Sequence, residues 1–259
     1  MYYCNVNFSY TNIAFLKVFK HIPNILTLSN LFCGILSILF ICGNHLIIGC
    51  YFIIIGAFFD FFDGMFARIL NVTSEQGKQL DSFADMVTFG IAPSILIFQL
   101  FFLIEGNDFF TNYNQDLSLY KSNGFAYCAF LITIFSALRL SKFNISENQK
   151  NHFIGLPTPA NALFLVSLVF IYKFDINSIF YDYLFSKYTI VLLCLAMSFL
   201  LISSIPFLNL KFKNYNFREN KYKYVFLILS FILLLLLHFE ASPFILILYL
   251  LISIIKNKK

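Results

Sequence analysis

Long apolar runs separated by short polar turns dominate this sequence of 259 residues, of which 59% are hydrophobic and 12% charged. Soluble domains carry about twice that share of charged residues. About 20 apolar residues in a helix cross the hydrocarbon core of a bilayer, which is about 30 Å thick. The sequence therefore predicts an all-α, polytopic transmembrane helix bundle of about eight spans: Ile25–Cys42, Leu46–Leu70, Gly77–Ile104, Gly124–Leu140, Pro157–Tyr172, Tyr188–Ile205, Tyr222–His238 and Ser242–Ile255.

The last two runs are short, so they form either two crossings or a re-entrant hairpin, and both arrangements leave the C-terminus on the same side.

Basic residues stay preferentially in the cytoplasm. With both termini inside, only Lys121, Lys173 and Lys187 of the 18 basic residues fall outside. The net charge of +5 then reflects membrane orientation and attraction to anionic lipids. A basic groove interleaved with aromatic residues is missing from the sequence, which excludes nucleic acid as a partner.

The chain divides into three parts by composition. Residues 1–22 form a cytoplasmic or interfacial N-terminal segment with apolar and basic residues. Residues 23–207 form the transmembrane core, which contains the candidate catalytic residues discussed below, and residues 208–259 form the C-terminal spans and a basic tail. The N-terminus lacks the features of a cleaved signal, so we expect the first span itself to direct insertion. The six cysteines are scattered singly, without metal-ligand spacing.

Four carboxylates interrupt or border the second and third apolar runs. Asp60 and Asp63 stand one helical turn apart, and Gly64 and Ala67 share their face. On the following helix Gly77, Asp81 and Asp85 form a second stripe. The turn between the two helices is short enough to fold them antiparallel, so the two stripes can face each other. Carboxylates at membrane depth are costly, which marks this convergence as functional.

Four close carboxylates cannot all stay ionised without a compensating cation. Because all the ligands are hard oxygen atoms, Mg²⁺ or Mn²⁺ is expected, with phosphate oxygens of a substrate completing the coordination. The small residues Gly64, Ala67 and Gly77 either permit close helix approach or leave room for a ligand. Arg68, one turn beyond Gly64, is either a phosphate contact or a cytoplasmic anchor.

The complete spacing DxxDGxxARx8GxxxDxxxD, from Asp60 to Asp85, resembles the signature of the CDP-alcohol phosphatidyltransferase family. The resemblance implies displacement of CMP from a CDP-linked lipid by an alcohol, in a six-helix core that commonly dimerises. It also implies metal ligation by Asp60, Asp63, Asp81 and Asp85, with Asp85 as the general base toward the incoming hydroxyl. The CDP site would then be lined by Gly64, Ala67, Arg68 and Gly77.

Four further segments are similar to bacterial membrane-embedded phosphatidylserine synthases, a branch of that family. They are HIPNILTLSNLFCG (21–34), SALRLSKFN (136–144), GLPTPAN (155–161) and SSIPF (203–207). This resemblance implies transfer of a phosphatidyl group from CDP-diacylglycerol to L-serine, giving phosphatidylserine and CMP. The expected setting is the bacterial inner membrane, with the active site facing the cytoplasm and a homodimer as the assembly.

Polar residues outside the signature supply candidates for the rest of the site. Asn24 and Thr27, with Asn30, recur at the start of the first span and are interpreted either as nucleotide contacts or as helix caps. Arg139 and Lys142 stand three residues apart at the cytoplasmic end of the fourth span. Their charges suit the serine carboxylate or a lipid phosphate, and equally suit ordinary cytoplasmic anchors.

Two alternatives stay open at this point. Within the same class of reaction, the acceptor could be glycerol 3-phosphate or an inositol phosphate, each of which requires an additional basic cluster for its phosphate. In another class, an acidic cluster inside a helix bundle could serve a cation transporter. A transporter is expected to place its acids near the bilayer midplane, whereas these acids lie toward one end of their spans.

Overall fold

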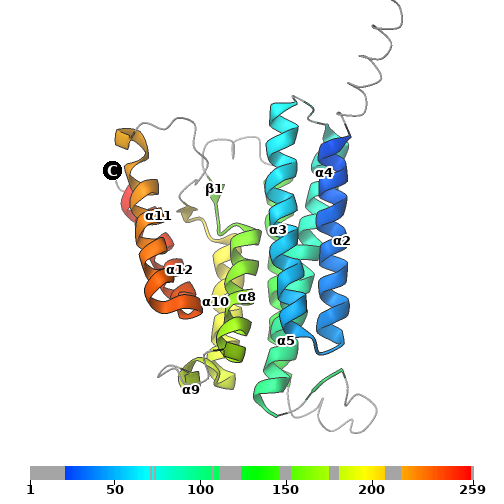
Figure 1. Cartoon of the computed structure of the whole chain (residues 1–259), viewed down its shortest axis with the longest axis vertical. Coiled ribbons are helices and arrows are strands. Elements are labelled where there is room, and N and C mark those ends of the chain that lie inside the picture. Colours follow the sequence, from blue (N-terminus) through cyan, green and yellow to red (C-terminus); the bar gives the residue numbers. More distant parts are fainter. Residues whose placement is uncertain are drawn as a thin grey trace, which may run out of the picture.

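The protein is a bundle of helices aligned along one axis, described here from a computed structural model (Figure 1). The structure describes residues 21–70, 72, 74–106, 108–110, 124–145, 153–174, 181–207 and 217–257. The first half contains α2 (Ile22–Cys42), α3 (Leu46–Ile69), α4 (Glu75–Asp85), the π-helical turn η1 (Met86–Ile91), α5 (Ala92–Ile104), the 3-10 helix η2 (Gly124–Ala129) and α7 (Phe130–Ile145).

The second half contains two short strands among its helices. Its elements are β1 (Phe153–Ile154), α8 (Thr158–Phe174), α9 (Tyr181–Leu184), α10 (Lys187–Ile202), β2 (Pro206–Phe207), α11 (Phe217–Leu237), the 3-10 helix η4 (His238–Glu240) and α12 (Ala241–Asn257). Most of the predicted N-terminal segment 1–22 lies outside the described residues. The three-part division of the chain stays a prediction.

The eight predicted apolar spans all correspond to helices, which confirms the polytopic membrane bundle. Five described helical segments are long and apolar enough to cross a bilayer: Ile22–Cys42, Leu46–Ile69, Glu75–Ile104, Gly124–Ile145 and Asn220–Leu237. The shorter apolar helices are Thr158–Phe174, Lys187–Ile202 and Ala241–Lys256. The expectation that both C-terminal spans are short is therefore wrong for α11, because the helix extends through polar residues before its apolar run.

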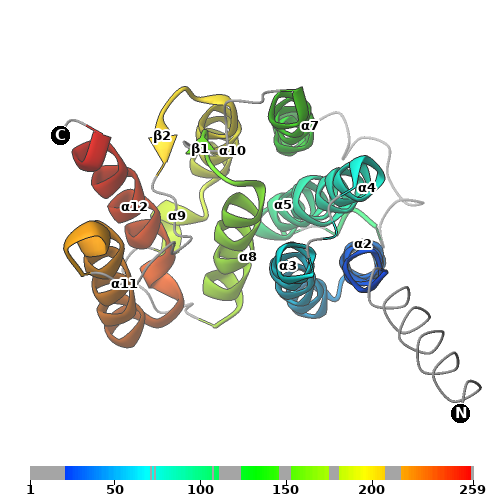
Figure 2. The same cartoon turned by 90° about the horizontal axis from the view of Figure 1, so that it is seen from above.

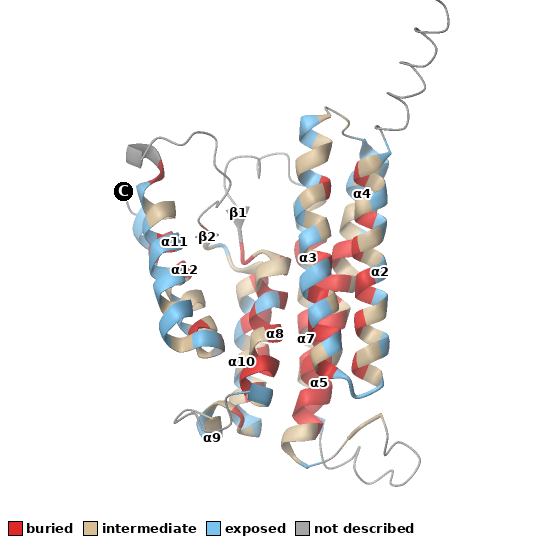
Figure 3. Ribbon diagram, in the orientation of Figure 1, coloured by how far each residue is buried: buried red, intermediate tan, exposed pale blue. Residues whose placement is uncertain are grey.

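The α4–α5 span lies at the centre of the molecule. In its most apolar stretch 72% of residues are buried, against 33% in α2 and α3 and 11% in α11. Figure 3 shows this difference as a concentration of buried residues along α5 and α8 and a largely exposed α11. The exposed side chains of α11 are mostly large and apolar, as expected for a surface facing lipid.

The π-helical turn η1 interrupts the central span directly after Asp85. Thr88 in this turn donates a hydrogen bond to the carbonyl oxygen of Asn30 at 3.0 Å. A Cβ at Gly34 or Gly56 would collide with Thr88, so α2 and α3 approach η1 at glycines. The turn is thereby locked against both helices. Such π-turns occur frequently at functional sites.

A two-residue antiparallel ladder joins the segment before α8 to the segment after α10. Phe153 pairs with Phe207, and Ile154 pairs with Pro206. Gly155 follows with a φ of +80°, a conformation that favours glycine, and a Cβ there would collide with the carbonyl oxygen of Leu201. Seen from above, β1 and β2 lie among α8, α10 and α12 (Figure 2). The α11–α12 hairpin contacts this region through α12, which packs against β2 and α8.

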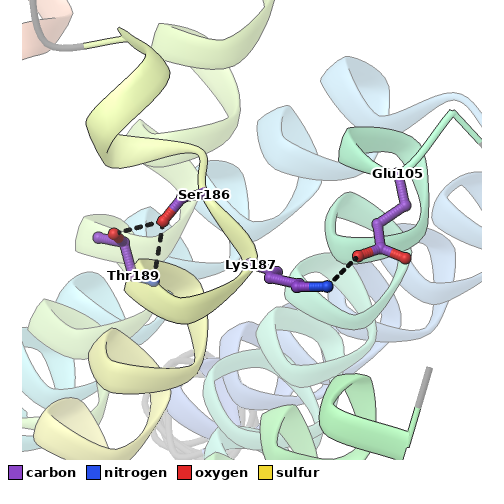
Figure 4. A network of polar contacts seen from close by, with 4 residues as sticks. All are labelled: Glu105, Ser186, Lys187 and Thr189. Carbon is purple, nitrogen blue, oxygen red and sulfur yellow. Dashed lines mark hydrogen bonds and ion pairs between the residues drawn. The ribbon is translucent and has the colours of Figure 1, made fainter. Parts of the chain in front are cut away.

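The far end of the bundle, where α9 lies in Figure 1, carries its own polar contacts. Lys187 Nζ lies 4.0 Å from Glu105 Oε1, which ties the start of α10 to the end of α5 (Figure 4). Ser186 caps α10 by accepting a hydrogen bond from the backbone nitrogen of Thr189 at 3.3 Å. These contacts stabilise the end opposite the carboxylate stripes.

Candidate functional site

Three of the four signature carboxylates converge between α3 and α4. One oxygen from each of Asp60, Asp63 and Asp81 lies within 4.8 Å of the other two. Helix α2 packs against both α3 and α4, so it serves as the common platform that sets their separation. Three hard oxygen donors at this spacing can share a divalent cation. The sequence prediction that the two stripes face each other is consistent with this cluster.

Helix α2 also orients two of the carboxylates by hydrogen bonds. The hydroxyl of Thr27 donates to Asp63 Oδ2 at 2.7 Å, and Asn30 Nδ2 donates to Asp85 Oδ1 at 3.4 Å. All four side chains are buried. Thr27 and Asn30 therefore hydrogen-bond to the carboxylates of the site. A role as helix caps would not account for these two hydrogen bonds. Their spacing of three residues places both on the face of α2 that meets the site.

Asp85 is buried like Asp63, with 9% of its surface exposed against 5% for Asp63. It interacts electrostatically with Asp60, Asp81 and Asp63. The three-carboxylate cluster does not include it. Asp85 ends α4 and η1 begins at the next residue, so the locked π-turn fixes where its side chain enters the site. This position is one from which a carboxylate can reach a reacting group beside the cluster.

A cavity of about 430 Å³ opens beside the carboxylate cluster. Its volume falls within the range typical of small-molecule sites. Its walls include Asp63 and Asp81 and the predicted ligand-site residues Asn24, Thr27, Gly64, Ala67 and Gly77. Lys78, which the sequence analysis did not propose, also lines it and donates to the carbonyl oxygen of Asn144 at 3.0 Å.

The two glycines of the cavity differ in what surrounds them. A Cβ added at Gly64 would meet no atom within 4 Å, so the missing side chain leaves open space in the cavity wall. A Cβ at Gly77 would lie 3.0 Å from Ser74 Oγ and 3.3 Å from Asn24 Oδ1. Gly77 thus permits the local packing in which its nitrogen donates to Ser74, the N-cap of α4. Of the two glycines, only Gly64 borders open space in the cavity.

Arg68 lies near the cavity without lining it. Its side chain is exposed, and Nε donates to the carbonyl oxygen of Gly64 at 2.8 Å. This bond folds the guanidinium back along α3 toward the cavity wall. The phosphate role predicted for Arg68 stays a prediction.

The structure separates the two basic residues predicted for the acceptor. Arg139 is buried, with 9% of its surface exposed, and interacts electrostatically with Asp85. Lys142 is exposed at the end of α7. Of these two basic residues, Arg139 therefore belongs to the buried interior and Lys142 to the surface. Tyr249 of α12 also interacts electrostatically with Arg139, and the sequence analysis missed it because the last two spans show no polar pattern.

The match to known proteins decides the family. Residues 20–255 match the family described as CDP-alcohol phosphatidyltransferase, which covers nearly the whole chain. The chain belongs to the CDP-alcohol phosphatidyltransferase family. Membership confirms the resemblance read from Asp60 to Asp85 and makes this integral membrane protein a phosphatidyltransferase of phospholipid biosynthesis. It also agrees with a divalent-metal site at the three clustered carboxylates, since the family generally depends on such ions.

Several relatives within the family are similar to this phosphatidyltransferase. The CDP-diacylglycerol–serine O-phosphatidyltransferase of Bacillus subtilis is 40% identical over 154 residues, which cover 60% of this chain and 78% of the relative. The protein of that name from Helicobacter pylori strain J99 is 36% identical over 149 residues, 57% of this chain and 56% of the relative. The archaetidylserine synthase of Methanothermobacter thermautotrophicus is 29% identical over 191 residues, 73% and 70% of the two chains.

Proposed function

We propose that this phosphatidyltransferase transfers the phosphatidyl group of CDP-diacylglycerol to the hydroxyl of L-serine, producing phosphatidylserine and CMP. The observation that carries the choice of acceptor is the buried guanidinium of Arg139, which interacts electrostatically with Asp85 and whose Nε has no hydrogen-bond partner among the described residues. A fixed, planar cation next to a potential base suits an acceptor that carries a carboxylate close to its reacting hydroxyl. The relatives whose names specify serine support the same choice.

The donor side of the reaction is assigned to the cavity between α2, α3 and α4. Asp60, Asp63 and Asp81 would hold Mg²⁺ or Mn²⁺, with Asp85 contributing as a fourth ligand. Bound there, the metal supplies positive charge that neutralises the diphosphate and the departing CMP. Asn24, Thr27, Gly64, Ala67 and Gly77 would surround the nucleotide, and Arg68 would approach a phosphate from the rim.

The acceptor side is assigned to Asp85 and Arg139. Asp85 would accept the proton of the serine hydroxyl while that oxygen attacks the phosphorus bearing the diacylglycerol group. A new bond forms between the serine oxygen and this phosphorus, and the bond from the phosphorus to the oxygen of CMP breaks. Arg139 would bind the serine carboxylate and thereby orient the hydroxyl toward Asp85. Lys142, exposed at the end of α7, would contact a lipid phosphate.

The proposed setting is the bacterial inner membrane, with the carboxylate cluster facing the cytoplasm and a homodimer as the working assembly. Placing the cluster inside follows the distribution of basic residues along the sequence. Polar substrates and CMP would then exchange with the cytoplasm, and the lipid chains would enter sideways from the bilayer.

A panel of acceptors tests the reaction. The purified protein is supplied with CDP-diacylglycerol and, in parallel, radiolabelled L-serine, glycerol 3-phosphate or an inositol phosphate, each with Mg²⁺, Mn²⁺ or a chelator. We expect labelled lipid and CMP with L-serine alone, in the presence of either metal. Labelled lipid from a phosphorylated acceptor would overturn the serine assignment. Metal flux into liposomes without any requirement for CDP-lipid would instead favour a transporter.

A further inference from the structure

Among the described residues that line the donor cavity, the single basic one is Lys78 of α4. Three acidic residues line the same walls: Asp63, Glu75 and Asp81. Within the described part of the chain, Lys78 forms no ion pair with a carboxylate, although Glu75 and Asp81 each stand three residues from it on the same helix. Its ammonium charge is therefore not committed to the acids of the cavity.

The position of Lys78 in its helix is electrostatically unfavourable. It is the fourth residue of α4, which begins at Glu75 after the N-cap Ser74. The dipole of a helix makes its N-terminal end positive, so acidic residues stabilise this end and basic residues stabilise the opposite end. Residues that break such a local rule are expected at functional or strained sites. A lysine here gains a favourable partner when an anion lies in the cavity beside it.

Hydrogen bonds hold Lys78 against the end of α7. Its Nζ donates to the carbonyl oxygen of Asn144 at 3.0 Å, and the side-chain nitrogen of Asn144 donates to Ser82 Oγ at 2.8 Å. Ser82 Oγ donates in turn to the carbonyl oxygen of Lys78 at 3.1 Å, which closes a ring between α4 and α7. The ring restricts the lysine side chain and engages one of the three N–H donors of its ammonium group. The described residues do not engage the other two.

We propose that Lys78 is a binding residue for the donor, in which the ammonium group contacts the diphosphate of the CDP-lipid. This inference rests on the proposed function, which places CDP-diacylglycerol in the cavity. The diphosphate is anionic and the other charged residues of the cavity wall are acidic, so binding requires positive charge. A divalent ion on the carboxylate cluster would balance part of the charge, and Lys78 adds a cation that belongs to the chain itself. Lysine suits this contact because it binds phosphate as a compact point charge.

The test is the substitution Lys78→Met, which removes the charge and keeps an unbranched side chain. Binding of CDP to the full-length protein in detergent is measured by isothermal titration calorimetry with Mg²⁺, at low and at high salt. We expect the dissociation constant for CDP at low salt to rise roughly tenfold, because hydrogen bonds between charged groups are among the stronger ones. Lys78→Arg should restore most of the affinity, since it keeps the charge.

Salt dependence separates a phosphate contact from a structural tie between helices. Salt screens interactions between exposed charges, so Lys78→Met should also reduce the weakening of CDP binding between low and high salt. Lys221→Met is the matched control, because Lys221 is likewise an exposed lysine near the start of a helix, α11, and does not line the cavity. It should bind CDP as the wild type does at both salt concentrations.

A second variant tests whether the ring or the charge matters. Ser82→Ala breaks the ring between α4 and α7 and keeps the ammonium group of Lys78. We expect it to weaken CDP binding less than Lys78→Met does. Equal losses in the two variants would overturn the inference. So would unchanged CDP affinity in Lys78→Met, or a loss of affinity in which the salt dependence of the wild type persists, because that pattern marks a structural role.

The outcomes also distinguish this inference from the proposed function. A wild-type protein that does not bind CDP would refute the assignment of the donor to this cavity, and the role of Lys78 with it. A wild-type protein that binds CDP but makes no lipid from L-serine would refute the acceptor alone, and the titrations would still decide the role of Lys78. Serine transfer together with unchanged CDP binding in Lys78→Met would refute only the role of Lys78.

Discussion

At the scale of single residues, Gly64 gives the sharpest test of the donor cavity. A methyl group at this position meets no protein atom within 4 Å, so Gly64→Ala should fold normally. In the cavity, however, the same methyl group occupies ligand space, and overpacking of that kind raises the KM for CDP-diacylglycerol by roughly tenfold. Steady-state kinetics against CDP-diacylglycerol, together with thermal unfolding in detergent, check this prediction.

The control for Gly64→Ala is Gly124→Ala, since Gly124 is also free of atoms within 4 Å and lies at the start of η2, away from the cavity. It should behave as the wild type in both measurements. Equal KM values for the two variants would mean that the CDP group does not approach Gly64.

Asp85 provides the second prediction at this scale. In Asp85→Asn the proposed proton acceptor is lost while Asp60, Asp63 and Asp81 keep their shared position. Turnover should fall by at least about 100-fold, the typical contribution of general-base catalysis. Binding of CDP-diacylglycerol, measured by protection against thermal unfolding, should persist in the presence of Mg²⁺. Retained turnover would remove Asp85 from the role of base.

The sequence predicted those parts of the candidate site that depend on residue spacing along a single helix, but not those that depend on tertiary packing. The spacing of Asp60, Asp63, Asp81 and Asp85 predicts two facing stripes because a helix turns through a fixed angle per residue. Burial is set by tertiary packing, so equal charges on Arg139 and Lys142 gave no sign that one is enclosed and the other exposed. Tyr249 sits in an apolar run where a tyrosine suggests only packing, and its partner is more than 100 residues away.

At the scale of elements, the contact of η1 with α2 and α3 determines the geometry around Asp85. A Cβ at Gly56 would lie 2.6 Å from Thr88 Cγ2 and 2.9 Å from Asn30 Oδ1. Asn30 in turn donates to Asp85. Gly56→Ala should therefore lower the free energy of unfolding by about 1–3 kcal/mol, the usual cost of overpacking, and reduce turnover as well. Thermal unfolding in detergent and the serine transfer assay measure the two effects.

Gly43→Ala serves as the control for the glycine substitution, because its added Cβ would make only ordinary contacts, the shortest at 3.5 Å to the carbonyl oxygen of Leu39. If Gly56→Ala and Gly43→Ala have the same free energy of unfolding, the close approach of α3 to η1 does not contribute to stability, and the prediction is wrong.

Hydropathy predicted the apolar helices but not where they begin or where their hydrogen-bond pattern changes. Apolar runs predicted all eight apolar spans, yet α11 begins at Phe217, within a polar stretch, and the central span contains a π-turn. A helix can extend beyond its apolar run into polar residues as long as its backbone hydrogen bonds continue. Hydropathy does not report these hydrogen bonds, so it does not predict where the helix ends. In the π-turn the carbonyl oxygen of Gly90 lies within hydrogen-bond distance of the hydroxyls of Ser94 and Thr133, which also contact each other. Hydrogen bonds of this kind, to a backbone carbonyl in a π-turn, depend on the tertiary arrangement of the helices. The periodicity of the sequence therefore does not predict them.

At the scale of the whole molecule, the end of the bundle that carries the carboxylate cluster can be compared with the side that carries the basic residues, and this comparison predicts the orientation in the membrane. The first turn of α4 lies at the cluster end, and α9 lies at the opposite end (Figure 1). Since 15 of the 18 basic residues fall on the cluster side by the topology of the spans, that side should face the cytoplasm. The proposed exchange of L-serine and CMP with the cytoplasm requires this orientation.

Two exposed positions report this orientation directly. In a background with the six native cysteines replaced, Gln76→Cys in α4 and Tyr183→Cys in α9 each present one thiol at the surface. A maleimide that cannot cross the membrane should label Tyr183→Cys in intact cells stripped of their outer layers, and label Gln76→Cys only after the membrane is opened. Both should react in detergent, which controls for reactivity. Labelling of Gln76→Cys before the membrane is opened would place the carboxylate cluster outside and contradict a cytoplasmic route for serine and CMP.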